Sequence, residues 1–291
     1  MPDKIIYRFA PTPSGYLHLG NVASFMFTIL LAKNENANLN LKPPQILLRI
    51  DDLDSDRTRS ICIDDIFRTL ELLEIDYQIG PKNTADFYQN YSQLTRLPLY
   101  NAALNFLKES NQLYACSCSR KDREQIQCSC SEKKISFDAT NVAWRLKIDL
   151  NKKIESLKEN GTRQTYTLND DFVVRQKNGK PAYQLATVVD DIHFGVNRIV
   201  RGEDLFSSTL MQIYLASLLP VKNYFDSVKF WHHPLLTDAE GVKLSKSAGA
   251  TAINSFTNIS ELKKELEEII NEWIYVKPTF FQIEKLVCNF D

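Results

Sequence analysis

The stretch Ala10-Pro-Thr-Pro-Ser-Gly-Tyr-Leu-His18-Leu-Gly20-Asn21 decides how the first part of this chain folds. It follows Ile5–Phe9, an apolar run that predicts a buried strand, and precedes Val22–Ala32, an apolar run that predicts a helix beginning at His18. A helix that begins after a strand and a tight turn presents free N–H groups and the positive end of its dipole to an anion. Glycines in the turn let a ligand approach the backbone closely. The stretch therefore predicts a phosphate site.

A second stretch, Val242-Lys243-Leu-Ser245-Lys246-Ser247, lies near the other end of the chain. Its lysines would bring positive charge to the far side of phosphates that are bound at the first stretch. Either stretch alone could be an ordinary turn. Their occurrence together, in this order, favours a nucleotide site.

Strands alternate with helices on both sides of a long interruption. After the first strand and helix, Gln45–Ile50 is typical of a buried strand and Ile61–Leu73 of an amphipathic helix. The alternation resumes late in the chain with the helix Ala182–Asp190, the strand Val196–Arg201, the helix Asp204–Leu219 and the strand-like Val228–Leu236. This order favours an α/β fold, a parallel sheet covered by helices, in which ligands gather at the carboxyl ends of the strands.

The interruption suggests how the chain is divided. We interpret residues 86–180 as an insertion that contains a helix near Tyr91–Ser110 and a strand over Val142–Ile148. Residues 1–85 and 181–247 would be the two halves of one Rossmann-like catalytic domain. Residues 248–291 are predicted to form a short helical tail, because Asn258 and Glu261 have the spacing of a helix-capping pair.

Four of the six cysteines gather as Cys116-Ser-Cys118 and Cys128-Ser-Cys130. Two close pairs of thiols are the arrangement expected of a structural Zn²⁺ site with four ligands. The neighbouring residues are polar and charged, so they offer little core in which the thiols could be buried. Cys62 lies in an apolar helical pattern and is predicted to be a small packed hydrophobe.

The composition fits a soluble enzyme with about two structural units: 291 residues, of which 44% are hydrophobic and 24% charged. The net charge of −1 argues against RNA binding driven by overall basicity, although a local basic patch can suffice. No apolar run approaches the roughly 20 residues of a membrane span, and the N-terminus lacks a secretory pattern. We therefore expect a cytoplasmic protein that does not act with a membrane.

Further segments carry a family resemblance: Arg8-Phe-Ala-Pro-Thr12-Pro-Ser-Gly, Leu48-Arg-Ile-Asp51-Asp-Leu-Asp54, Tyr183-Gln-Leu-Ala with Val188-Val-Asp-Asp191, and Val200-Arg201-Gly-Glu-Asp204. With the two stretches above, they resemble the glutamyl- and glutaminyl-tRNA synthetases, a subclass of class I aminoacyl-tRNA synthetases. The nearest form resembles the short glutamyl-queuosine tRNA(Asp) synthetases, which correspond to a catalytic half alone. The resemblance implies a class I catalytic domain with an inserted zinc-containing subdomain. Residues 248–291 would be too few for an anticodon-binding domain.

Carried over residue by residue, the resemblance implies an amino-acid pocket beside an ATP site. Arg8, Arg201 and Tyr183 would hold the side-chain carboxylate of L-glutamate, since guanidinium groups bind carboxylates in a bidentate way. Asp51 and Thr12 would bind its α-amino group, and Thr187 would border the pocket. The implied ATP-binding residues are His18, Gly20, Asn21, Asp204, Lys243, Ser245 and Lys246. Of these, His18, Lys243 and Lys246 would be catalytic by stabilising the phosphates, and Mg²⁺ would accompany the ATP.

Two positions depart from the family pattern. Asp51 stands where the family usually has Glu, which moves the carboxylate back by a methylene group. The second Cys-x-Cys pair stands where the queuosine-modifying enzymes usually have a Tyr and a Cys. From the residues alone, Arg8 could be a surface charge at the rim of the sheet and Tyr183 could pack in the core. Asp51 and Asp52 could likewise cap a helix or bind Mg²⁺ weakly.

The implied reaction is the ATP-dependent formation of glutamyl-adenylate, followed by transfer of the glutamyl group to queuosine in the anticodon of tRNA(Asp). We expect the enzyme to be a monomer. Two alternatives stay open: a truncated synthetase-like enzyme that charges a tRNA 3′ end or another acceptor, and a non-enzymatic tRNA-binding paralogue. His193, His232 and His233 have no comparable context, and His232 and His233 are predicted to be structural.

Overall fold

Parallel strands drawn from both ends of the chain form the sheet that carries the site. The computed structural model describes residues 4–39, 42–54, 56–119, 121–122, 128–157, 163–221, 227–237, 253, 256 and 258–276. The sheet has four strands in the order β2-β1-β8-β9, all of them parallel: β1 Ile6–Phe9, β2 Gln45–Leu48, β8 Arg198–Gly202 and β9 Lys229–His233. The α/β fold and these strands are as the sequence predicted.

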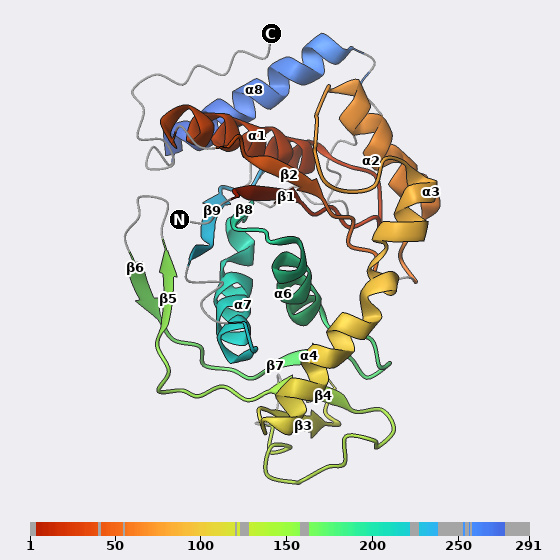
Figure 1. Ribbon diagram of the computed structural model, residues 1–291, viewed down its shortest axis with the longest axis vertical. Helices are drawn as coiled ribbons and strands as arrows, with labels where there is room; N and C mark the ends of the chain where they lie inside the picture. The colour runs from red at the N-terminus through yellow and green to blue at the C-terminus, as the bar shows by residue number, and fades with distance from the viewer. Residues whose placement is uncertain are drawn as a thin grey trace.

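Helices cover both faces of this sheet (Figure 1). On one face lie α1 (Leu19–Leu39), α2 (Ser60–Leu72) and α8 (Ile259–Val276), and on the other α6 (Tyr183–Phe194) and α7 (Phe206–Leu218). These helices begin close to the predicted starts, but α1 continues to Leu39, beyond the predicted end at Ala32, and α6 continues to Phe194, beyond the predicted end at Asp190. Among the described helices, none combines the length and the apolar character that crossing a membrane requires.

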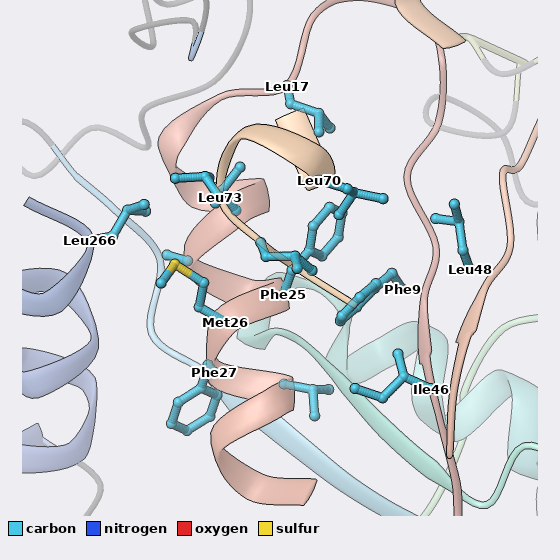
Figure 2. Packing of buried hydrophobic residues seen from close by; sticks show 14 of the residues in the cluster. Phe9, Leu17, Phe25, Met26, Phe27, Ile46, Leu48, Leu70, Leu73 and Leu266 are labelled. Atoms are coloured by element: carbon cyan, nitrogen blue, oxygen red, sulfur yellow. The ribbon is translucent and has the colours of Figure 1, made fainter. Parts of the chain in front are cut away.

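Alternate residues of the strands enter two separate cores. Phe9, Ile46 and Leu48 pack with α1, α2 and α8 (Figure 2), whereas Leu47 and Ile199 pack with α6 and α7. This follows from strand geometry, in which successive side chains point to opposite faces. Because both faces are covered, apolar residues occur on both faces of the strands, and the sequence could therefore predict them as buried.

The segment between the two halves of the sheet forms a separate set of elements. It begins with α3 (Thr84–Asp86), the short η1 (Phe87–Tyr91) and η2 (Gln93–Arg96), and α4 (Leu97–Glu109). An antiparallel sheet in the order β3-β4-β7 follows, with β3 Leu113–Cys116, β4 Ala143–Leu146 and β7 Phe172–Arg175, together with the hairpin β5 (Ile154–Leu157) and β6 (Arg163–Tyr166). The sequence predicted one helix over Tyr91–Ser110, but α4 starts at Leu97. Pro98 explains this start, because proline fits the first turn of a helix and not its interior.

The tail helix α8 lies along α1 (Figure 1). Asn258 caps it as predicted, since its Oδ1 accepts a hydrogen bond from the N–H of Ser260 at 2.9 Å. Its buried residues recur at helical spacing and belong to the same core as α1: Leu262, Leu266, Ile270 and Trp273. The helix therefore completes the layer on that face of the sheet.

Candidate functional site

A cavity of about 630 Å³ opens at the carboxyl ends of the strands, beside the N-terminus of α1. It brings together most of the residues that the sequence singled out: Arg8, Thr12, His18, Gly20, Asn21, Asp51, Tyr183, Arg201 and Asp204. Thr187 is buried and is not among the residues that line the cavity within the described part of the chain. Lys243, Ser245 and Lys246 lie outside the described residues.

The phosphate-site turn is held by a few specific hydrogen bonds. The N–H of Leu17 donates to Asp65 Oδ2 at 3.0 Å, which ties the turn to α2. Asn21 Oδ1 accepts from the N–H of His18 at 3.2 Å, so this side chain fixes the helix start. At Gly20, a Cβ atom would lie 3.2 Å from the His18 ring, so glycine leaves room for that ring against the backbone. The turn thereby orients His18 and the free N–H groups of α1 together.

Two of the cavity arginines are already paired with buried carboxylates. Arg8 Nε donates to Asp191 Oδ1 at 2.8 Å, and Arg49 Nη1 donates to the same oxygen at 2.7 Å. Arg49 also grips Asp51 with two hydrogen bonds of 2.6 and 3.0 Å. These groups are almost fully buried, so each charge is balanced within the protein. The alternative of a surface charge at Arg8 is therefore wrong.

Arg201 is different, because its hydrogen-bond partners are polar but not acidic, although the charge of Asp191 also acts on it. Its Nη1 donates to Gln212 Oε1 at 2.9 Å and its Nη2 to Thr209 Oγ1 at 2.5 Å, and its guanidinium lies 5.3 Å from the centre of the Phe230 ring. Within the described residues no carboxylate forms an ion pair with it, and its Nε has no hydrogen-bond partner. Burial lowers the pKa of Arg201 to about 10, so the side chain is still a cation at neutral pH. The cavity therefore contains a buried positive charge that an anionic ligand would neutralise.

Asp51 faces the cavity, but both its oxygens accept hydrogen bonds from Arg49. Burial raises the pKa of this carboxyl, and the charge of Arg49 opposes that rise. A carboxylate can accept about four hydrogen bonds, so two positions remain for a ligand ammonium group. The sequence did not single out Arg49, although it follows a buried strand just as Arg8 and Arg201 end theirs.

Asp52 and Asp190 join the site to the insertion. Asp52 accepts hydrogen bonds from Ser92 Oγ at 2.5 Å and from the N–H of Gln93 at 2.7 Å, so it holds the start of η2. Asp190 accepts from Arg96 Nε and from the Tyr100 hydroxyl, both at 2.7 Å. Burial acts to raise the pKa of Asp190, but the hydrogen bonds from Arg96 and the charge of Arg49 lower it on balance. Asp52 thus has a structural role in this network.

Several ring side chains lie in or beside the cavity, and for Tyr183 the sequence left core packing open. Tyr183 is the first residue of α6, is 45% exposed and lines the cavity, so it does not pack in the core. His232 Nε2 lies 2.7 Å from Thr209 Oγ1, so it supports the hydroxyl that binds Arg201, in keeping with a structural role. His233, which was predicted to be structural, and the buried Trp273 also line the cavity.

The four clustered cysteines lie at the far end of the molecule, around the end of β3 (Figure 1). Their Sγ atoms all lie within 4.8 Å of one another. The separations are 3.7 Å for Cys116 to Cys128, 3.7 Å for Cys118 to Cys128 and 3.5 Å for Cys118 to Cys130. Tetrahedral zinc with Zn–S bonds of about 2.3 Å separates its sulfur ligands by about 3.8 Å. The donor set therefore fits zinc in number, type and spacing.

Comparison with known proteins adds independent findings. Residues 4–271 match the family described as tRNA synthetases class I (E and Q), catalytic domain. The glutamate–tRNA ligase of Anaeromyxobacter sp. (strain Fw109-5) is 26% identical over 99% of this chain, which spans 62% of that relative's length. The glutamyl-Q tRNA(Asp) synthetase of Dechloromonas aromatica (strain RCB) is 32% identical over 89% of this chain and 84% of its own length. The crystal structure of glutamate–tRNA synthetase from Elizabethkingia anophelis has a TM-score of 0.66 at 23% identity, covering 88% of this chain and 54% of that one, and so shares the fold.

Proposed function

Because the chain belongs to the family of class I tRNA synthetase catalytic domains for glutamate and glutamine, we propose that it activates L-glutamate with ATP and transfers the glutamyl group to a tRNA. The observation that carries this proposal is the state of Arg201. It is a buried cation on the wall of the cavity, and no carboxylate of the described residues pairs with it. The side-chain carboxylate of glutamate would supply the missing negative charge.

The same charge argues for glutamate over glutamine. A neutral amide would leave a desolvated guanidinium with no directly paired carboxylate, which is costly, whereas a carboxylate pairs with it and accepts its hydrogen bonds. Arg8 lies in the same cavity but shares its charge with Asp191. We therefore assign Arg201 the main electrostatic role, and Arg8 and Tyr183 the roles of further hydrogen-bond donors. Asp51 and Thr12 would meet the α-ammonium group.

The chemistry needs orientation and charge stabilisation and no protein nucleophile. An oxygen of the α-carboxylate attacks the α-phosphorus of ATP, a bond forms between them, and the bond from that phosphorus to pyrophosphate breaks. His18 and the N-terminus of α1 would bind the phosphates, and Lys243 and Lys246 would stabilise the departing pyrophosphate. Asp204 lines the same cavity, which supports its assignment to the ribose. Mg²⁺ would accompany ATP and neutralise part of the phosphate charge.

For the acceptor, we propose queuosine in the anticodon of tRNA(Asp). The similarity to the Dechloromonas aromatica glutamyl-Q tRNA(Asp) synthetase supports this choice, because it extends over most of both chains. The similarity to glutamate–tRNA ligases favours charging of a tRNA 3′ end as the second candidate. Zn²⁺ on Cys116, Cys118, Cys128 and Cys130 would be structural and would organise the insertion, at a distance from the reacting groups.

The activation step is tested by amino-acid-dependent exchange of labelled pyrophosphate into ATP. Glutamate, glutamine and aspartate are compared with and without tRNA, because some members of the subclass need RNA for activation. We expect exchange with glutamate. Preferential exchange with glutamine would contradict the assignment of Arg201, and exchange with none of the three would favour the non-enzymatic paralogue.

The acceptor is tested separately with labelled glutamate. Queuosine-containing tRNA(Asp), queuosine-free tRNA(Asp) and tRNA(Glu) are offered in parallel. Labelling confined to the queuosine-containing form is the expected result. Equal labelling of both forms of tRNA(Asp), or labelling of tRNA(Glu), would replace queuosine with a 3′ end as the acceptor.

A further inference from the structure

The cavity has a second part whose chemistry differs from that of the arginines. Its lining includes Phe25, His233, Leu235, Leu236 and Trp273. Trp273 belongs to α8, the helix that follows the predicted lysine loop in the chain, and is 2% exposed. A helix outside the strand–helix alternation of the catalytic sheet thus contributes a side chain to the wall of the site.

Trp273 fixes the plane of the His233 ring. The two rings stack with their centres 4.0 Å apart and their planes at 11°. Phe27 of α1 meets Trp273 edge-on, with the ring centres 5.8 Å apart. Stacked and edge-to-face contacts of this kind favour defined ring orientations. Trp273 is therefore held by α1 on one side and in turn orients His233.

The hydrogen bonds of His233 decide what this ring can offer a ligand. Its Nδ1 lies 2.8 Å from the carbonyl oxygen of Pro234, which can only accept, so Nδ1 carries the proton. Its Nε2 lies 3.1 Å from Ser24 Oγ. Both nitrogens are thus engaged by the protein. The ring lines the cavity, and a role in proton transfer would require one of these hydrogen bonds to break.

The position of this wall points to the nucleotide end of the site. Ser24, which engages His233, lies four residues after Gly20 on α1, so both are on the same face of the helix, and both line the cavity. The wall is therefore adjacent to the predicted phosphate site at the N-terminus of α1. The side chain of glutamate offers only two methylene groups to an aromatic and aliphatic wall, whereas the planar base of a nucleotide offers a whole ring face.

We propose that Trp273 is a positioning residue for the nucleotide: it holds the His233 ring as a wall against which the adenine of ATP packs. This inference rests on the proposed use of ATP. It makes α8 a part of the nucleotide site as well as a packing element.

The test is the effect of Trp273→Leu on the KM for ATP and the KM for glutamate in pyrophosphate exchange. Base–aromatic stacking is worth about 1–3 kcal/mol, so we expect the KM for ATP to rise about tenfold or more. The KM for glutamate should change less than about twofold, since the arginine end is untouched. Trp273→Phe should recover most of the affinity for ATP. Trp144→Phe, in the insertion core, is the matched control.

A second pair of variants separates the ring surface from the ring nitrogens. His233→Ala should raise the KM for ATP as Trp273→Leu does, and His233→Phe should recover affinity because it restores a stacked ring without nitrogen atoms. An equal rise of both KM values in Trp273→Leu would overturn the inference, as would an unchanged KM for ATP in the folded variant. Failure of His233→Phe to improve on His233→Ala would also overturn it.

Binding of a non-hydrolysable ATP analogue, followed by tryptophan fluorescence, tests the inference without any exchange activity. We expect a change in emission that Trp273→Phe abolishes and Trp144→Phe retains. If the wild-type protein shows no exchange with any amino acid but this fluorescence change occurs, the proposed reaction fails and the inference stands. An emission change that persists in Trp273→Phe would contradict the inference.

Discussion

The cavity and the cysteine cluster are organised in different ways. In the cavity, the charged groups are held by one another: Asp191 accepts hydrogen bonds from Arg8 and Arg49, and Arg49 also binds Asp51. In the cluster, four thiols converge within 4.8 Å of one another, which is a donor set suited to an ion. The cavity is thus preorganised by its own ion pairs, whereas the cysteine cluster would depend on the proposed metal. One charge, that of Arg201, is the exception within the cavity.

The largest expected effect comes from breaking the shared carboxylate. Asp191→Ala should lower the free energy of unfolding by about 3–5 kcal/mol, because it leaves the buried guanidinium of Arg8 without its counter-charge and removes one of the carboxylates that pair with Arg49. Urea unfolding followed by circular dichroism measures this. Asp54→Asn is the matched control: Asp54 pairs with Arg57 at the surface, with side chains 53% and 78% exposed, so its loss should cost about 0–1 kcal/mol. Similar losses in both variants would show that the buried network does not organise the cavity.

The next largest effect is expected at the lysine loop, residues 242–247, which would contribute to the reaction in the cavity and not to the structure of the insertion. Lys246→Ala should raise the activation free energy of glutamate-dependent pyrophosphate exchange by about 2–4 kcal/mol, through loss of a charge on the departing pyrophosphate. Lys133→Ala, beside the cysteine cluster, should leave the exchange rate unchanged. Near-wild-type exchange in Lys246→Ala would remove the loop from the mechanism.

Replacing Arg201 should weaken the binding of glutamate without lowering the stability of the fold. Arg201→Gln should weaken the binding of glutamate by about 1.5–3 kcal/mol, the usual contribution of a hydrogen bond to a charged group. The KM for ATP should change little. It should not lower the free energy of unfolding, because it removes a buried charge that lacks an acidic partner among the described residues. Kinetics and urea unfolding are measured on the same preparation, with Arg163→Gln at the surface as control. A loss of stability like that of Asp191→Ala would mean that Arg201 is as well compensated as Arg8.

The smallest effect on the rate of pyrophosphate exchange should come from loss of the proposed zinc ion. Protein purified without chelator should contain one zinc ion per chain, and the double variant Cys118→Ser, Cys128→Ser should lose it. We expect faster proteolysis within the insertion but a change of less than about 1 kcal/mol in the activation free energy of exchange, under about fivefold. Elemental analysis that finds no stoichiometric zinc in the wild-type protein would contradict the metal assignment.

Much of the fold could be predicted because its signals are local. Runs of apolar residues predicted the four parallel strands, which are buried on both faces, and helical spacing predicted α2 and α8. Asn258 predicted the start of α8, and the spacing of the cysteines predicted a four-thiol cluster. The boundary of α4 was misplaced because helical periodicity extends past the point where Pro98 sets the first turn.

The sequence by itself therefore determined the order of the elements, the buried faces of the strands and the residue types available at their ends. Tertiary structure alone decided which of three similar arginines keeps an unbalanced charge, because Arg8 and Arg49 find Asp191 across 183 and 142 residues of chain. It also decided that Trp273 reaches the cavity through its stack on His233. The physical reason is range. Periodicity is a property of neighbouring residues, whereas an ion pair or a ring stack depends on positions a few ångströms apart in space that folding brings together.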